Sequence, residues 1–65
     1  MEKILSKYGF VKDDNTNSWI RDNWVVNFGS ELIEFAEDFD KVKNPRYFIG
    51  LIDKIDVETI LEDIS

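Results

Sequence analysis

Hydrophobic and polar positions follow two different periods along this 65-residue chain. At residues 24–28 large apolar side chains occupy every second position, and this period of two predicts a half-buried strand. Residues 57–64 instead carry apolar side chains at intervals of three and four, which predicts an amphipathic helix. Asp56 stands at the N-cap position of that helix, where its carboxylate can accept hydrogen bonds from the first free backbone amides. The chain thus combines at least one strand with a C-terminal helix.

Shorter segments complete the predicted fold. Residues 2–8 have the apolar spacing of a short helix, and Gly9 is suited to end it in the left-handed conformation. Strand-forming residues are concentrated at 10–12, 19–21 and 31–37. The links between these strands are too short for the crossover that parallel strands require, so neighbouring strands are expected to be antiparallel.

The predicted fold class is α+β: a small antiparallel β-meander of about three to five strands, flanked by a short N-terminal helix and a C-terminal helix. Turn signals separate the strands, at the Asx-rich residues 13–18, at 22–23 and at 29–30. A polar connection follows at 41–45. One domain spanning residues 1–65 is expected, because a chain of this size has material for a single core.

Residues 46–52 fit two structures. Asn44 could cap a helix with Pro45 at its first position, and the apolar residues that follow also fit helical spacing. The aromatic and β-branched residues, with Gly50 among them, favour a strand instead. The strand is the favoured interpretation, and it would be apolar on both faces.

Composition excludes several classes of site. The chain has no Cys and no His, which removes disulfides, thiolate zinc sites, thiol nucleophiles and the commonest general base. Hydrophobic residues form 43% of the chain and aromatic residues 14%, so the composition is that of a folded domain. A net charge of −6 argues against direct binding to nucleic acid, because cationic side chains supply most of the affinity for phosphates. No cofactor is expected.

One polar segment resembles the beginning of an EF-hand calcium loop. Asp13, Asn15 and Asn17 would supply oxygen ligands on alternate positions. That loop requires glycine at its sixth position and a bidentate glutamate at its twelfth, where this chain has Ser18 and Trp24. An Asx-rich hairpin loop is therefore expected here, and no metal site.

Acidic residues are concentrated in two blocks. Residues 31–40 have a net charge of −5 and residues 53–65 of −4, with a basic segment of +3 at 41–46 between them. If the fold brings the two blocks together, they form a face that attracts a basic partner. A solvated surface that keeps a small domain soluble is the alternative, and catalytic carboxylates are disfavoured because so small a fold offers little wall for a cleft. The candidate residues of this acidic face are Glu34, Glu37, Asp38, Asp40, Glu58, Glu62 and Asp63.

Three further residues are candidate anchors for a partner: Trp19, Arg46 and Tyr47. Trp, Tyr and Arg side chains contribute most to binding hot spots when they lie at an interface. The alternative for a tryptophan is burial in the core, which is expected for at least one of Trp19 and Trp24.

The sequence contains no recognisable targeting or membrane segment. Residues 1–8 are too charged for a secretory signal, and residues 47–52, the longest apolar stretch, are far shorter than the roughly 20 residues that cross a bilayer. A cytoplasmic protein without membrane contact is expected. Residues with AT-rich codons far outnumber those with GC-rich codons, which favours a low-GC bacterium or one of its phages as the source.

These observations favour a non-enzymatic, acidic protein-binding module. The leading hypothesis is a phage or mobile-element accessory protein that inhibits a host defence or nucleic-acid-handling protein, by occupying its surface or by mimicking DNA. Its partner would be a larger protein with a basic surface, in the cytoplasm of a bacterial host cell. Two alternatives stay open: a small structural subunit of a homo-oligomer, including a homodimer, and an immunity or antitoxin protein that neutralises a basic nuclease.

Overall fold

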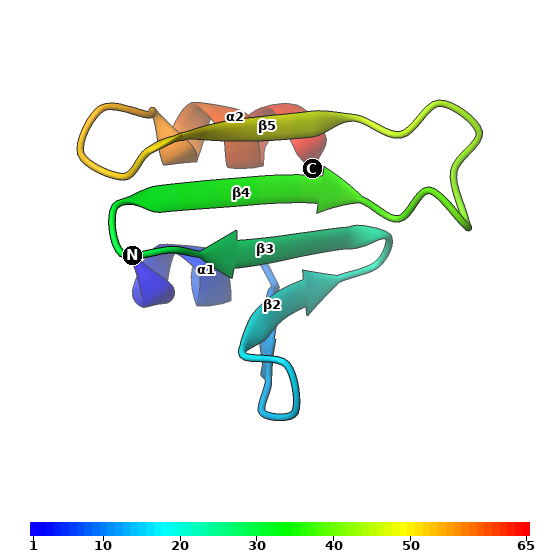
Figure 1. The fold of residues 1–65 in the computed structure, drawn as a ribbon, viewed down its shortest axis with the longest axis horizontal. Coiled ribbons are helices and arrows are strands. Elements are labelled where there is room, and N and C mark those ends of the chain that lie inside the picture. Colours follow the sequence, from blue (N-terminus) through cyan, green and yellow to red (C-terminus); the bar gives the residue numbers. More distant parts are fainter.

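The computed structural model describes the whole chain, Met1–Ser65, as a five-stranded antiparallel sheet with two helices (Figure 1). The strands follow the chain in the order β1-β2-β3-β4-β5, so every link joins neighbouring strands. Both helices lie behind the sheet in the view of Figure 1, and the near face carries no helix. This meander with a helix at each end of the chain confirms the predicted α+β fold class. The elements are α1 (Glu2–Lys7), β1 (Val11–Asp13), β2 (Ser18–Arg21), β3 (Trp24–Phe28), β4 (Leu32–Glu37), β5 (Tyr47–Leu51) and α2 (Val57–Ile64).

The helices end and begin at residues that suit those positions, as predicted. α1 is followed by Gly9 at a φ of 88°, the left-handed conformation that glycine adopts without strain. At α2, the Asp56 carboxylate accepts the backbone N–H of Thr59 at 3.2 Å and its hydroxyl at 2.8 Å. These two hydrogen bonds, that of the hydroxyl above all, lower the pKa of Asp56. Neither helix has the length and the apolar run required to cross a membrane.

Residues 47–51 form strand β5, which confirms the favoured interpretation of this segment. β5 pairs with β4 along its whole length, with Gly50 opposite Ile33. Gly50 faces the helices, and Ile55 packs directly over it: a Cβ added at Gly50 would lie 2.9 Å from Ile55 Cδ1. The glycine that interrupts the apolar run is needed for the close approach of the link between β5 and α2.

The core fills the space between the sheet and the helices. Every second residue of β3 and β4 points into it, and Val26, Ile33 and Phe35 are completely buried. Trp24 stacks on Phe48 of β5 with ring centroids 6.1 Å apart, which extends the apolar packing to the edge of the sheet. The buried members of the core are Leu5, Phe10, Trp19, Trp24, Val26, Ile33, Phe35, Val57, Leu61 and Ile64.

Arg21, at the end of β2, connects the sheet to the C-terminal ends of both helices. Its Nη1 donates to the Tyr8 carbonyl at 2.7 Å, and its Nη2 donates to the Ile64 carbonyl at 3.2 Å. Nη1 also donates to the Ser65 hydroxyl at 3.0 Å, and the guanidinium lies 4.8 Å from the centroid of the Phe10 ring. The last carbonyls of a helix lack intrahelical partners and carry partial negative charge, so one cation stabilises both helix ends.

Replacing Arg21 with alanine should lower the free energy of unfolding by about 3 kcal/mol, because the hydrogen bonds to the helix ends and the contact with the Phe10 ring are lost together. Urea denaturation followed by tryptophan fluorescence measures this change. Asp22→Asn is the matched control, because it removes only the 3.9 Å ion pair that Arg21 makes with an exposed carboxylate. A loss of similar size in the control would contradict the assignment of Arg21 to the helix ends.

Gly50→Ala should destabilise the fold by about 1–3 kcal/mol, since Ile55 must move to admit the new Cβ. Gly29→Ala supplies the comparison, because there the nearest heavy atom, Leu32 Cβ, lies 3.8 Å from an added Cβ. A change within about 0.5 kcal/mol is expected for that variant. Thermal unfolding by circular dichroism measures both, and equal stability of the two variants would show that Ile55 has room to adjust.

Candidate functional site

The sheet has one face covered by helices and one face left open (Figure 1). Side chains alternate between the two faces along each strand, and the buried hydrophobic positions identify the covered face. The remaining strand positions make up the open face. Its residues are Val11, Asp13, Ser18, Ile20, Val25, Asn27, Leu32, Glu34, Ala36, Tyr47, Ile49 and Leu51.

An apolar row crosses the open face from one edge of the sheet to the other. Each of the five strands contributes one member to it. Directly opposed side chains on one face of an antiparallel pair have their Cβ atoms about 4.5–5.5 Å apart, within contact distance. The row is thus a continuous strip rather than a scatter of single side chains. Its members, each directly opposite the next in the strand register, are Val11, Ile20, Val25, Ala36 and Tyr47.

The open face exposes more apolar surface than the solvated face of a sheet usually does. Antiparallel sheets with one face on the core commonly carry polar residues on the other. Here Val11 is 70% exposed, Tyr47 56% and Ile49 51%. Leu32 and Leu51, which pair with each other beside the β3–β4 turn, are exposed as well. Contiguous exposed apolar residues of this kind make the open face the candidate interaction surface.

A hydrogen-bonded polar row runs beside the apolar row. The Ser18 hydroxyl donates to Asn27 Oδ1, and Asn27 Nδ2 donates to Glu34 Oε1 at 3.2 Å. The Tyr47 hydroxyl donates to the other carboxylate oxygen of Glu34 at 2.5 Å. These bonds link β2, β3, β4 and β5 and hold Glu34 in one position on the open face. A shallow hollow of about 230 Å³ lies beside Asn27 and Glu34 and is bounded by Leu32.

The contact with Glu34 raises the pKa of Tyr47 above its ordinary value. The hydrogen bond to the carboxylate is the largest cause, followed by desolvation of the phenol and by the negative charge of Glu34. Ionising Tyr47 would remove the donated bond and place two negative charges side by side. Tyr47 is therefore protonated at neutral pH and keeps donating to Glu34.

Charge on the open face is negative. Asp13 and Glu34 are the charged residues at its strand positions, and no Lys or Arg occupies any of them. Alternation turns the side chains of Lys12 and Arg21 to the covered side of the sheet. The open face thus combines carboxylates with apolar side chains, which complements a surface that bears both cations and apolar groups.

Glu37 and Arg46 form an ion pair at the C-terminal end of β4, beside Trp24. Arg46 Nε and the Arg46 backbone N–H both donate to Glu37 Oε1, at 3.2 and 2.9 Å. The guanidinium lies 5.1 Å from the centroid of the Trp24 ring. The hydrogen bonds from Arg46 lower the pKa of Glu37. These two predicted site residues are engaged with each other, and the Glu37 side chain is only 10% exposed.

The other acidic candidates lie on two further parts of the surface. Asp38 and Asp40 belong to the connection between β4 and β5, where Asp38 accepts the Asp40 N–H at 2.9 Å and lies 4.0 Å from Lys41 Nζ. α2 carries the remaining candidates on the side of the sheet opposite to Glu34 (Figure 1). The two acidic blocks therefore do not form one face. The exposed candidates on α2 are Glu58, Glu62 and Asp63.

The three candidate anchors lie in different environments. Trp19 is 8% exposed and belongs to the core, so it lacks the exposure that an anchor needs. Trp24 is buried too, which confirms that at least one tryptophan is a core residue. The Arg46 side chain is half exposed but bound to Glu37. Tyr47 alone of the three lies on the open face.

Most of the open face was not among the predicted site residues, which include only Glu34 and Tyr47 of its members. The candidate residues leave out the exposed apolar positions on β2, β4 and β5, such as Ile20 and Ile49. For β5 the signal was present, because the expected strand is apolar on both faces, whereas a strand with one solvated face needs only alternate apolar residues.

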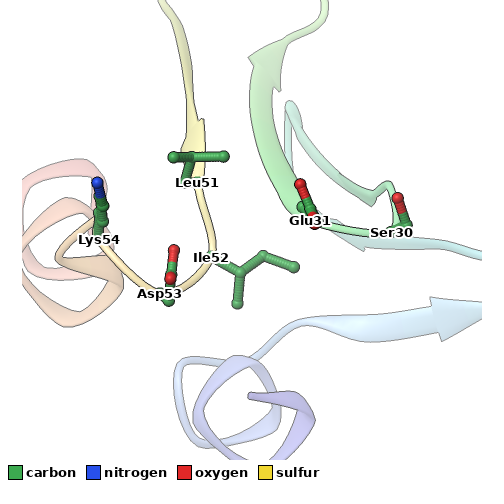
Figure 2. A pocket seen from close by; sticks show the side chains of 6 residues that line it. All are labelled: Ser30, Glu31, Leu51, Ile52, Asp53 and Lys54. Carbon is green, nitrogen blue, oxygen red and sulfur yellow. The ribbon is translucent and has the colours of Figure 1, made fainter.

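A depression of about 430 Å³ lies at one end of the sheet, where the β3–β4 turn meets the link after β5. Figure 2 shows Ser30 and Glu31 on one side of it and Asp53 and Lys54 on the other, with Ile52 extending between them. The Ile52 N–H donates to the Glu31 carbonyl at 2.8 Å and ties the two segments together. The charged groups do not converge on a shared point, and no three acidic side chains of the molecule lie close enough together to hold a metal ion.

No protein-family model, curated protein or solved structure matches this chain. What the open face can do rests on its own chemistry: apolar contact along one row, hydrogen bonding along the next, and attraction of cations by Glu34 and Asp13.

Glu34→Gln should lower the pKa of Tyr47 toward its ordinary value, because the amide oxygen accepts the phenol hydrogen bond without a negative charge. The pKa of Tyr8 should not follow, since it is raised first by desolvation and then by Glu62 and Glu58 of α2. NMR titration distinguishes the two tyrosines, and an unchanged pKa of Tyr47 would contradict the role of the Glu34 charge.

The same titration affects stability at alkaline pH. The raised pKa of Tyr47 means that the folded state holds this proton more tightly than the unfolded state does. The resulting stabilisation is complete below the ordinary tyrosine pKa and is lost as pH rises through the raised value. In Glu34→Gln the loss should be complete at a lower pH than in the wild type.

Proposed function

We propose that this chain is a non-enzymatic protein-binding module that docks the open face of its sheet onto a larger protein. The observation that carries the proposal is the apolar row beside Glu34, which crosses all five strands and is exposed at Val11, Ile20 and Tyr47. Carboxylates lie next to it, and no Lys or Arg occupies a strand position of the open face. The partner surface has the complementary chemistry, with apolar groups at its centre and Lys or Arg side chains around them.

The open face is preorganised for such a contact. Ile20 and Val25 are β-branched, so their side chains have few rotamers to lose on binding. Glu34 is already held by Asn27 and Tyr47 through hydrogen bonds. The entropic cost of docking is therefore smaller than for a surface of long, free side chains.

The acidic blocks support the same proposal at longer range. They do not share one surface, but they give the domain its net charge of −6. A net charge of this sign raises the rate of association with a basic protein, most strongly at low ionic strength. Long-range electrostatic attraction by the whole domain and direct contact by the open face thus contribute separately to binding.

Within this class we favour an inhibitor encoded by a phage or mobile element, which occupies a basic surface of a host protein in the bacterial cytoplasm. The small size and acidic charge of the chain support this version. The separation of the acidic residues into several groups favours occupation of a surface over mimicry of DNA, because a DNA mimic presents its charges as a regular array. Neutralisation of a basic nuclease by an immunity protein would use the same face.

Ile20→Lys should weaken partner binding about 30-fold, which corresponds to about 2 kcal/mol, because it removes a central apolar contact and places a cation opposite a basic surface. The partner is first captured from host lysate by the immobilised wild-type chain and identified by mass spectrometry. Binding of that purified protein to each variant is then measured by isothermal titration calorimetry at two salt concentrations.

Phe39→Lys is the matched control, because Phe39 is 78% exposed and lies in the β4–β5 connection, outside the open face. It changes the net charge as Ile20→Lys does, and its affinity should stay within about two-fold of the wild type. Weaker binding of Phe39→Lys with unchanged binding of Ile20→Lys would place the contact on the connection and contradict the proposal.

A further inference from the structure

The two edges of the sheet differ in how they are protected. β1, at one edge, has 3 residues, which include Lys12 and Asp13. Short length and charged side chains keep an edge strand from pairing with other chains. β5, at the other edge, has 5 residues, Tyr47–Leu51, and contains no charged residue and no proline. Its pairing with β4 is continuous, so no bulge twists this edge away from a neighbour.

The outer side of β5 presents backbone groups at alternate residues. The Arg46 carbonyl accepts the Glu37 N–H, and the Ile52 N–H donates to the Glu31 carbonyl, so the backbone groups of these even-numbered residues point toward β4 and the turn before it. Backbone groups alternate in direction along an antiparallel pair, so Tyr47, Ile49 and Leu51 direct their N–H and C=O groups outward. The Leu51 carbonyl already accepts N–H groups from the link to α2. The other outward groups have no partner strand, because β5 is the last strand of the sheet.

We propose that a second copy of this chain pairs with β5 in antiparallel orientation, with Ile49 on the two-fold axis. Each Ile49 N–H then donates to the Ile49 carbonyl of the second copy, and each Leu51 N–H donates to the Tyr47 carbonyl of the second copy. This register satisfies the outward donors and acceptors at the centre of the seam. The pairing goes beyond the binding function proposed above and does not depend on it.

The charges that flank β5 are complementary in this arrangement. Residues 41–46, before the strand, carry a net charge of +3, and residues 53–58, after it, carry −2. Arg46 and Lys41 also lie beside Glu37 and Asp38 of their own chain, whereas no ion pair engages Lys43. An antiparallel seam places the segment before β5 of one copy beside the segment after β5 of the other. Basic and acidic segments therefore meet on both sides of the two-fold axis, which offsets the repulsion between two chains of charge −6. A parallel seam would bring like charges together.

Pairing through β5 also joins the open faces of the two copies. Side chains that oppose each other across an antiparallel seam stay on one face of the sheet. Tyr47 of one copy then lies opposite Leu51 of the second copy, and the exposed apolar surface continues across the axis. The dimer presents one open face about twice as wide as that of a single chain.

Sedimentation equilibrium of the purified full-length chain tests the pairing. At about 1 mM the weight-average mass should approach twice the 7.7 kDa of one chain, and it should return to 7.7 kDa on dilution, as expected for a small interface. A mass of 7.7 kDa at every concentration overturns the proposal. Amide exchange locates the seam: protection of the Ile49 and Leu51 amides should rise with concentration, while that of Lys12 at the other edge stays constant.

Two substitutions at one position separate the seam from the fold. Ile49→Pro removes an outward N–H without breaking a bond to β4, so it should abolish the dimer and retain the circular dichroism spectrum. Ile49→Lys places two cations opposite each other on the axis and should give the same loss. This second variant keeps the test decisive if the proline variant does not fold.

Ile20→Lys is the control for the seam, because it puts the same side chain on the open face three strands away from β5. This variant should dimerise as the wild type does, whereas its binding to the larger partner is weakened if the proposed function is correct. The two proposals can thus fail separately. Loss of the dimer in Ile20→Lys with retention in Ile49→Lys would mean that the open faces pair and the β5 edges do not, which overturns the inference.

Discussion

Two short helices cover one face of this sheet, and no helix lies on the opposite face. α1 and α2 have 6 and 8 residues. A helix with its side chains is about 10 Å wide, and five strands spaced about 4.8 Å apart make a sheet about 19 Å across. The two helices together match the width of one face, and both lie on the same side (Figure 1). The character of the opposite surface then depends on which side chains the strands turn toward it.

Arg21 ties this one-sided arrangement together. The last turn of α2 has no basic residue and carries Glu62 and Asp63, whose charges oppose the helix dipole there. The guanidinium of Arg21 on β2 donates to carbonyls at the ends of α1 and α2. Its positive charge offsets the partial negative charge at both helix ends. The sheet thereby holds the helices that cover it. α2 can keep its acidic surface as a result, and that surface adds to the net charge of the domain without touching the open face.

The spacing of apolar residues within each strand was enough to predict the fold class and the face of the sheet to which the side chains of the longer strands point. It was not enough to predict which residues form the candidate site. Glu34 and Glu37 are three residues apart in β4, so a period of two places them on opposite faces and divides the acidic block. That consequence could have been drawn from the sequence. The orientation of Trp19 could not, because β2 is short and only its register with β3, which sets Trp19 opposite the buried Val26, turns it inward. Tyr47 faces outward for the corresponding reason in β5, since long-range pairing determines the face.

β5 can serve both proposed contacts because they use different atoms of the same residues. Side chains project out of the plane of a sheet, whereas the N–H and C=O groups of an edge strand lie within it. A protein docked on the open face contacts the Ile49 side chain, and a second copy at the edge contacts the Ile49 backbone. A lysine at this position would protect the face from apolar association and the edge from strand pairing at once. A chain that is 34% charged places no charge anywhere in β5, the strand in which a charge would prevent both contacts, and this distribution favours β5 as a surface for contact rather than for solvent.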